Sequence, residues 1–376
     1  MGHTFGDRLI IAIGERISSG FNSHDVYRLG GDEFTVNLKG YESLKEVIES
    51  AEKINNLMKE PLRVEESLIY ITISMGIALY PENGSNADEL LKNSDIALYK
   101  AKESGKSRYV LFDQAMNAAV NERMIIEKNL RTALEKDELL LYYQPQVDLK
   151  TNIITGFEAL IRWQNPELGF VPPNRFIGIA EDTHLIIPIG EWVLENACIF
   201  IKKIHDQGYP DVSIAVNISI VQFLQDNFTN DVLRILDLTG LDPHNLELEI
   251  TESVVIKSYQ VIGEKLACLR EKGIKIAMDD FGNGFSSLSG LQNLKIDTLK
   301  IDKVFVDNIL ISEEKSLVEN IIEMGNKMGL TVLAEGVETK EQLDYLKRYG
   351  CHKMQGYYFS RPLPEEKAIA LALELH

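Results

Sequence analysis

Polar side chains able to do metal or proton chemistry follow short apolar runs at several places in the second half of the chain. Each run has the length and β-branched content of a buried strand. The residues that end or follow these runs are Glu158, Asn217, Glu249, Asp279, Asp280, Lys300 and Glu335. A single acidic residue after a strand is ordinarily a helix cap or a solvated loop residue, and we interpret Asp302 and Glu338 in that way. Recurrence after six strands of one repeating pattern instead indicates a shared site.

Five of these side chains are carboxylates, and five carboxylates in one cleft would repel one another and have raised pKa values. Bound divalent cations remove that penalty. An all-oxygen ligand set without Cys or clustered His favours Mg²⁺ or Mn²⁺ over zinc. Two ions bridged by one carboxylate suit phosphodiester cleavage, because they activate water and neutralise phosphoryl oxygens. Adjacent Asp279 and Asp280 reach one cleft only if their strand ends there, and Gly282-Asn283-Gly284 indicates that it does.

A strand-then-helix rhythm from Leu139 onward would position these residues. Strands are predicted at 139–143, 156–162, 213–217, 247–250, 275–278, 298–301, 331–334 and 354–359. Helices are predicted between most of them, for example at 188–207, 256–271 and 316–328. Eight strands in roughly 240 residues predict the α/β class and a (β/α)8 barrel of the TIM type. In such a barrel the active site lies at the carboxyl ends of the strands, where the polar residues stand.

The first part of the chain differs in character and predicts a separate α+β domain over residues 1–112. Helices are predicted at 6–19, 41–59 and 87–103, and strands at 26–29, 34–38 and 68–79. The turn Gly30-Gly31-Asp32-Glu33 predicts a hairpin. A helix capped by Asp113 and running to about residue 135 is predicted next, with 113–123 as a semi-rigid linker and 124–376 as the second domain.

Composition restricts the function classes further. A net charge of −18 argues against binding of a nucleic-acid polymer, although it leaves room for a local pocket for an anion. No apolar run reaches the roughly 18–20 residues needed to cross a bilayer. Three widely spaced cysteines, Cys198, Cys268 and Cys351, predict neither a disulfide framework nor a zinc site. We therefore expect a cytoplasmic protein without a membrane segment.

At the polar strand ends the sequence resembles the EAL family of cyclic di-GMP phosphodiesterases, over about residues 124–376. Seven motifs carry the resemblance in order: Glu158-Ala159-Leu160-Ile161-Arg162-Trp163 preceded by Tyr143-Gln144-Pro145, Val216-Asn217-Ile218-Ser219, Glu249-Ile250-Thr251-Glu252, Asp279-Asp280-Phe281-Gly282, Leu299-Lys300-Ile301-Asp302, Ala334-Glu335-Gly336-Val337-Glu338 and Gln355-Gly356-Tyr357. Each motif alone is weak, and together they are highly specific.

The resemblance implies a barrel enzyme that opens cyclic di-GMP to linear pGpG with two Mg²⁺ or Mn²⁺ ions. It assigns one ion to Glu158, Asn217, Glu249 and Asp279, and the other to Asp279, Asp280 and Glu335. It assigns Lys300 to the nucleophilic water, Glu252 to tethering the loop after Asp280, and Glu335, Lys300 and Glu252 to the catalytic set. It assigns substrate contacts to Gln144, Leu160, Arg162 and Gln355, with Gln355 near the second ion, and it implies a homodimer formed through this domain.

Three positions depart from the family's pattern. Asn283 and Phe285 replace the usual Thr or Ala and the usual Tyr in a loop that couples dimerisation to metal binding in the family. His352 stands where an acidic residue is usual. The loop changes bear on activation more than on metal ligation.

The first domain resembles the GGDEF family of diguanylate cyclases, through Arg28-Leu29 followed by Gly30, Gly31, Asp32, Glu33 and Phe34, and through Ser74–Ala78 and Asp95–Lys102. The chain begins after the point where that family's first strand lies, and that strand supplies a metal-binding Asp and an Asn that contacts guanine. We therefore expect no cyclase activity. The domain is either a degenerate regulatory domain, with GTP as a possible ligand, or a truncation product.

Two other functions remain open from sequence. A cyclic di-GMP receptor without catalysis would use the same barrel, but degenerate members typically lose metal ligands and this chain keeps them all. A diguanylate cyclase would require GTP turnover by an incomplete site.

Overall fold

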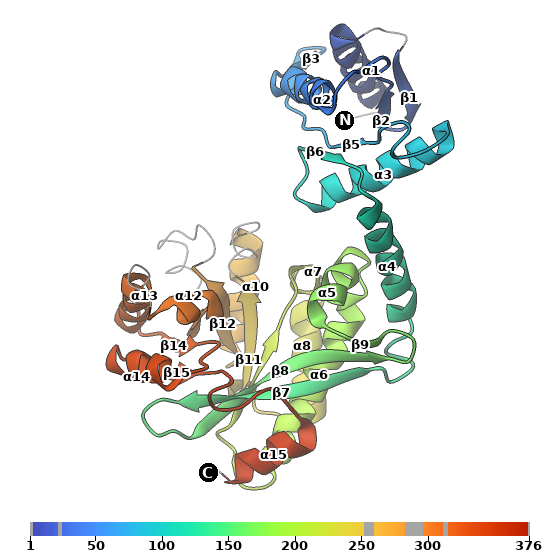
Figure 1. Ribbon diagram of the computed structural model, residues 1–376. Helices are drawn as coiled ribbons and strands as arrows, with labels where there is room; N and C mark the ends of the chain where they lie inside the picture. The colour runs from blue at the N-terminus through green and yellow to red at the C-terminus, as the bar shows by residue number, and fades with distance from the viewer. Residues whose placement is uncertain (1–2, 22–24, 252–258, 283–295, 311–314, 375–376) are drawn as a thin grey trace. The chain divides into compact units, whose positions relative to one another are not determined.

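The computed structural model describes residues 3–21, 25–251, 259–282, 296–310 and 315–374. The chain divides into two compact units, Met1–Ile125 and Ile126–His376, and each is described by itself (Figure 1). Within the described ranges, no helix combines the length and the apolar character needed to cross a membrane.

The second unit is built on a barrel (Figure 1). Its strands are β7 (Leu139–Asp148), β8 (Ile154–Asn165), β9 (Gly169–Val171), β10 (Ser213–Asn217), β11 (Leu246–Thr251), β12 (Lys275–Phe281), β13 (Thr298–Ile301), β14 (Thr331–Ala334), β15 (Lys353–Met354) and β16 (Leu363–Pro364). Its helices are α5 (Pro173–Asp182), α6 (Ile186–His205), α7 (Ile220–Phe223), α8 (Phe228–Thr239), η2 (Pro243–Asn245), α10 (Tyr259–Glu271), α12 (Lys303–Asn308), α13 (Lys315–Lys327), α14 (Lys340–Arg348) and α15 (Glu365–Glu374).

Eight strands close the ring in the order β7-β15-β14-β13-β12-β11-β10-β8, and pairing of β8 with β7 completes it. The six strands β8, β10, β11, β12, β13 and β14 run parallel, so their carboxyl ends share one end of the barrel. The short strands β9 and β16 extend the sheet beside β8 and β7. The predicted barrel is therefore confirmed.

The barrel departs from a regular (β/α)8 barrel at β7, which is antiparallel to both β8 and β15. A parallel partner needs a crossover connection of a dozen or more residues, and only residues 149–153 separate β7 from β8. The two strands therefore form a hairpin. The last predicted strand, 354–359, is also wrong in extent, since β15 covers only Lys353 and Met354.

The core of this unit lies between the outer faces of the strands and the helices. Side chains alternate along each strand, so Phe157 packs outward against Phe200 of α6 while its neighbour Glu158 takes the inner face. Tyr143 stacks on Phe200 with ring centroids 3.5 Å apart. Buried Glu138 accepts hydrogen bonds from Trp163 Nε1 at 3.0 Å and Asn165 Nδ2 at 2.9 Å, which fixes the start of the β7–β8 hairpin.

Within its described residues, the first unit contains three separate two-stranded sheets with helices. Its elements are α1 (His3–Gly20), β1 (Val26–Gly30), β2 (Glu33–Val36), α2 (Leu44–Lys59), β3 (Leu62–Val64), β4 (Ser67–Ile69), β5 (Met75–Ile77), α3 (Ala87–Glu103), β6 (Tyr109–Leu111) and the first part of α4 (Gln114–Leu130). The predicted helix from Asp113 begins as expected, with the Asp113 carboxylate accepting from Ala115 N, but it ends at Leu130.

One strand prediction in the first unit is wrong. The predicted strand 68–79 is two strands in different sheets, because β4 pairs antiparallel with β3 whereas β5 pairs parallel with β6. Alternation of side chains reports the two faces of an extended segment and carries no information about its pairing partner. The predicted hairpin at Gly30–Glu33 is confirmed, with Gly31 at φ +51° in its turn.

Candidate active site at the carboxyl ends of the strands

A buried lysine lies at the centre of the site. Lys300, on β13, is 1% exposed, and four carboxylates from other strands surround its ammonium. Lys300 Nζ lies 2.7 Å from a Glu249 oxygen, 2.7 Å from Glu335, 3.1 Å from Asp279 and 3.9 Å from Glu158. We call Glu158, Glu249, Asp279 and Glu335 the carboxylate ring. The prediction that acidic residues from distant strands meet in one place is thus fulfilled in the geometry.

Strand register explains why the ring closes. Parallel pairing places Ala215 beside Glu158, Asn217 beside Glu249, and Thr251 beside Asp279. Asn217 thus lies two residues beyond the partner of Glu158, and Asp279 two residues beyond the partner of Glu249, whereas Asn217 and Glu249 are direct partners; offsets of this kind arise from the stagger of a tilted barrel. Glu335 follows β14 directly, and its backbone N–H donates to Ile301 O at 3.0 Å.

Asp279 and Asp280 both reach the site, but for a reason other than the predicted one. β12 does not end at these residues and continues to Phe281. Its pairing with β13 slips between Met278 and Phe281, and Asp280 adopts a left-handed backbone with φ +55°. This bulge turns two consecutive side chains to one side of the strand. Carboxylate oxygens of Asp279, Asp280 and Glu335 consequently all lie within 4.8 Å of one another.

Amides complete the polar network on the β8 side. Asn217 Nδ2 donates to Glu158 Oε1 at 2.6 Å, and Gln355 Nε2 donates to the other Glu158 oxygen. Gln355 Nε2 also donates to Gln144 Oε1 at 3.0 Å, and Gln144 Nε2 donates to Ser360 O at 3.1 Å. Asn217, Gln355 and Gln144, which come from distant parts of the barrel sequence, therefore form one hydrogen-bond network around Glu158.

The predicted substrate residues Leu160 and Arg162 follow Glu158 at alternate positions of β8, so they share its face. The Arg162 guanidinium lies over the ring of Tyr142, 5.6 Å from its centroid, and Tyr142 pairs with Leu160 across the hairpin. Sequence reasoning missed Tyr142, although its spacing of two from Gln144 on an alternating strand was an available signal. Burial lowers the pKa of Arg162, and the Glu158 charge opposes that change.

The electrostatics of the site are those of crowded, buried acids. Burial, with the charges of neighbouring carboxylates, raises the pKa of Glu249 well above its usual range and that of Glu335 to about 8, while Lys300 opposes both shifts. Burial and the Asp279 charge raise the pKa of Asp280 to about 6. Burial lowers the pKa of Lys300, but the carboxylate ring more than reverses this and raises it well above 10.5.

The donor set fits divalent cations. Glu249 Oε1 is fully buried and, among the described residues, has no hydrogen-bond partner, so an acceptor inside the site is unsatisfied. Asp279, Asp280 and Glu335 together offer three carboxylates against the single charge of Lys300. Oxygen ligands at this density suit hard ions such as Mg²⁺ or Mn²⁺.

Several predicted residues lie elsewhere. Glu252, Asn283 and Phe285 fall outside the described residues. Asp302 caps α12, with its carboxylate accepting from Val304 N at 2.7 Å, and exposed Glu338 accepts from Lys303 Nζ at 2.7 Å, in agreement with the structural roles expected of them. His352 lies beside the beginning of β14, where its Nδ1 accepts from Val332 N at 3.0 Å.

The GGDEF-like motif occupies the turn of the β1–β2 hairpin. Gly30, Gly31, Asp32 and Glu33 are exposed and Phe34 is half-buried. In the part of the chain that the structure describes, neither Asp32 nor Glu33 belongs to a group of three acidic, His or Cys side chains close enough to share an ion.

Comparison with known proteins adds to this geometry. Residues 127–362 match the family model of the EAL domain, and residues 1–108 match that of the diguanylate cyclase, GGDEF domain. The bifunctional diguanylate cyclase/cyclic di-GMP phosphodiesterase MucR of Pseudomonas aeruginosa is 38% identical over 98% of this chain and 54% of its own length. The cyclic di-GMP phosphodiesterase NbdA of the same organism is 37% identical over 97% of this chain and 47% of its own length. The chain thus spans about half the length of these relatives.

A solved structure described as "PaMucR Phosphodiesterase, c-di-GMP complex" is similar to the second unit. It is 39% identical and has a TM-score of 0.63, and the match covers 65% of this chain and 99% of that one.

Proposed function

Because the chain belongs to the EAL family and carries a GGDEF domain ahead of its barrel, we propose that it hydrolyses cyclic di-GMP to linear pGpG with two divalent cations. One observation carries the proposal: four carboxylates, three on strands and Glu335 directly after β14, converge on buried Lys300, with Asp280 turned toward them. Relatives that carry the name of cyclic di-GMP phosphodiesterase, and a similar structure with cyclic di-GMP, support the choice of substrate.

In this proposal Glu158, Asn217, Glu249 and Asp279 would hold one ion, and Asp279, Asp280 and Glu335 would hold the other. Their proximity and the unsatisfied oxygen of Glu249 support this division. When bound, Mg²⁺ or Mn²⁺ supplies Lewis-acid activation of water and neutralisation of charge on the phosphoryl oxygens.

The chain's own groups have separate tasks. Lys300 fixes the positions of the carboxylate ring and donates to the attacking water. Glu335 is only partly buried and lies 2.7 Å from Lys300 Nζ, so it can hold the second ion beside that water. Arg162 binds a substrate phosphate, since a guanidinium matches its oxygens. The remaining substrate contacts come from Gln144, Leu160 and Gln355. Glu252 holds the loop that follows Asp280.

We propose that the GGDEF domain is a regulatory domain without cyclase activity, with GTP as a candidate ligand. The exposure of Asp32 and Glu33 and their distance from any described three-residue acidic group support this. A homodimer through the barrel remains part of the proposal.

The test is a chromatographic assay of cyclic di-GMP with Mg²⁺ or Mn²⁺, with and without GTP. We expect pGpG as the product, no cyclic di-GMP made from GTP, and loss of turnover in Glu158→Ala. Glu323→Ala, on the exposed face of α13, is the matched control and should keep the wild-type rate. Tight binding of cyclic di-GMP by calorimetry without turnover in folded, metal-replete protein would replace the proposal with a receptor function.

A further inference from the structure

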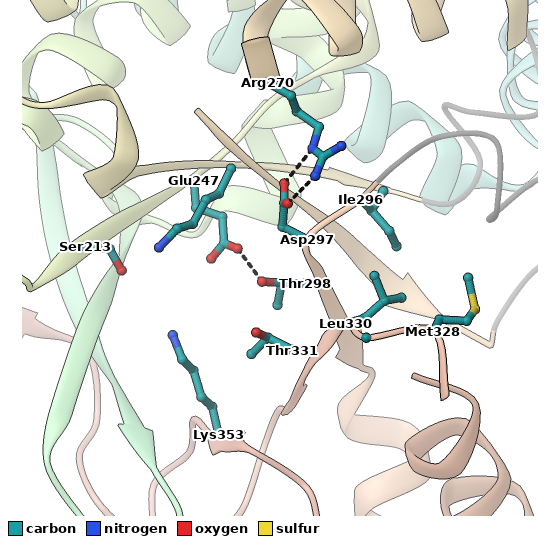
Figure 2. Close-up of a pocket in the computed structure, with 12 residues that line it drawn as sticks. Ser213, Glu247, Arg270, Ile296, Asp297, Thr298, Met328, Leu330, Thr331 and Lys353 are labelled. Carbon is teal, nitrogen blue, oxygen red and sulfur yellow. Dashed lines mark hydrogen bonds and ion pairs between the residues drawn. The ribbon is translucent and has the colours of Figure 1, made fainter. Parts of the chain in front are cut away.

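The barrel has a second polar cavity at the end opposite the carboxylate ring. It has a volume of about 510 Å³ and is lined by the first or second residues of successive strands (Figure 2). These are Ser213 of β10, Glu247 of β11, Lys275 of β12, Thr298 of β13, Thr331 of β14 and Lys353 of β15. We call this space the amino-terminal cavity.

The polarity of the amino-terminal cavity is unusual for a barrel. Barrel interiors of this type are normally filled by layers of bulky branched apolar side chains. Here the strand-start positions carry hydroxyl, carboxylate and ammonium groups, and apolar side chains such as Ile296 and Leu330 form only one wall (Figure 2). The space is therefore suited to a polar ligand.

Of the three cationic side chains that line the cavity, two lack a partner among the described residues. Arg270 is neutralised by Asp297 through two hydrogen bonds of 2.6 and 3.0 Å (Figure 2). Within the described residues, neither Lys275 nor Lys353 has a side-chain hydrogen bond or an ion pair within 4.0 Å. Glu247 is the remaining carboxylate of the lining, and it accepts from the Thr298 hydroxyl. The lining therefore carries two ammonium groups against the one carboxylate of Glu247, and Asp148, the partner of Lys353 on β7, is a further acidic neighbour outside the lining.

A buried amide beside the cavity is also unsatisfied. Gln146 is 1% exposed, and both its Nε2 and its Oε1 lack a partner among the described residues. A Cβ added at Gly156 would lie 2.6 Å from Ser213 Oγ and 3.5 Å from Gln146 Oε1. The absence of a Cβ at Gly156 thus gives room to the Ser213 hydroxyl, which lines the cavity, with the Gln146 amide close by.

We propose that the amino-terminal cavity binds a small oxyanion with a phosphate-like head, held between Lys275 and Lys353. The flanking hydroxyl of Thr331 is an additional donor for such a group, whereas Ser213 Oγ already donates to Thr155 O at 3.2 Å. An oxyanion would satisfy the two lysines at once, which Glu247 alone does not do. Burial lowers the pKa of Lys353 and the charge of Lys275 adds to this, while Glu247 and Asp148 oppose it.

Calorimetric titration of the full, Mg²⁺-loaded chain with inorganic phosphate at constant ionic strength tests this inference. Lys353→Met and Lys275→Met should each weaken phosphate binding by about tenfold or more, because each removes a charged hydrogen-bond donor. Lys272→Met removes a lysine that is exposed like Lys275 and lies three residues from it, but outside the cavity lining, and it should leave the affinity unchanged. Equal phosphate affinity in all four proteins, or no binding by the wild type, would overturn the inference.

Crystals of the wild type grown with molybdate give a second test that needs no variant. We expect an anomalous peak between Lys275 and Lys353, and its absence at saturating molybdate refutes the site. A parallel titration with glycerol 3-phosphate separates the two sources of such a head group, since tighter binding than phosphate identifies an ester and weaker binding identifies the free ion. None of these measurements depends on cyclic di-GMP hydrolysis.

Discussion

Replacing Lys300 by methionine should destabilise the metal-free protein strongly and the metal-loaded protein much less. Methionine has a similar length and fills the same buried space, but it leaves the carboxylate ring without a positive charge. The described structure places that charge within 3.9 Å of all four ring carboxylates. Divalent cations bound to the same carboxylates would supply the missing charge.

The size of the effect follows from the distances. At an effective dielectric constant of about 20, unit charges 2.7 Å apart attract by roughly 6 kcal/mol, and those 3.9 Å apart by roughly 4 kcal/mol. Desolvation of the buried groups offsets most of this attraction, and removal of one partner from a buried ion pair costs about 3–5 kcal/mol net. At about 2–4 °C per kcal/mol for a domain of this size, the Tm should fall by about 6–20 °C.

The assay is thermal unfolding of wild type and Lys300→Met at pH 8, in EDTA and in saturating Mn²⁺. Lys303→Met is the matched control, because Lys303 is half-exposed and pairs with Asp307 and Glu338 at the surface, where such pairs contribute about 1 kcal/mol or less. Equal Tm values for wild type and Lys300→Met in EDTA would refute the reasoning. So would a difference that Mn²⁺ fails to reduce.

Three further predictions concern stability. In EDTA the free energy of unfolding should fall as the pH rises from about 4.5 toward 8, because folded Glu335, with its pKa raised to about 8, retains a proton that the unfolded chain has released. Denaturant titrations at pH 6 and pH 8 should show this slope, and Glu335→Gln should flatten it. Gly156→Ala should lower the free energy of unfolding by about 1–3 kcal/mol, because the new Cβ would lie 2.6 Å from Ser213 Oγ. Gly178→Ala, in α5 with no atom within 4 Å of the new Cβ, should raise it by roughly 0.5–1 kcal/mol. Urea titration measures both, and equal effects would contradict the packing described. Glu138→Leu should leave the buried donors of Trp163 and Asn165 unpaired and lower the free energy of unfolding by about 1–3 kcal/mol for each, while Leu in place of exposed Glu135 should have little effect. Unfolding followed by tryptophan fluorescence measures both variants. A Glu138→Leu protein as stable as wild type would show that the two donors find other acceptors.

The carboxylate ring could be predicted from the sequence because one simple rule of barrel geometry brings its members together. Parallel strands share an end, so polar residues that end such strands as Ser213–Asn217 and Leu246–Thr251 must converge. Asp302 and Glu338, one turn further along, were separated from the ring by the same reasoning. The seven motifs made the family recognisable without any structure.

Other features depend on contacts that a sequence pattern does not encode. The bulge at Asp280 arises from a slip in pairing between two strands, and neither strand alone reveals it. The antiparallel direction of β7 depends on a connection too short for a crossover, although an alternating segment has the same pattern in either direction. Lys275 and Lys353 stand 78 positions apart in apparently ordinary strand starts, and only closure of the barrel brings them to one cavity.

The seam that closes the barrel has a consequence for synthesis of the chain. β7 pairs with β15 and β16, and Gln144 bonds to Gln355, 211 residues later. During synthesis on the ribosome, most of the barrel strands are made before β15 and β16. Until then the barrel is an open sheet in which one edge of β7 is unpaired. Long-range closure of this kind is slow to form and exposes that edge to other chains. The segment from β15 to β16 therefore completes the barrel, and Gln355, which donates to Glu158, is made only after most of the barrel strands.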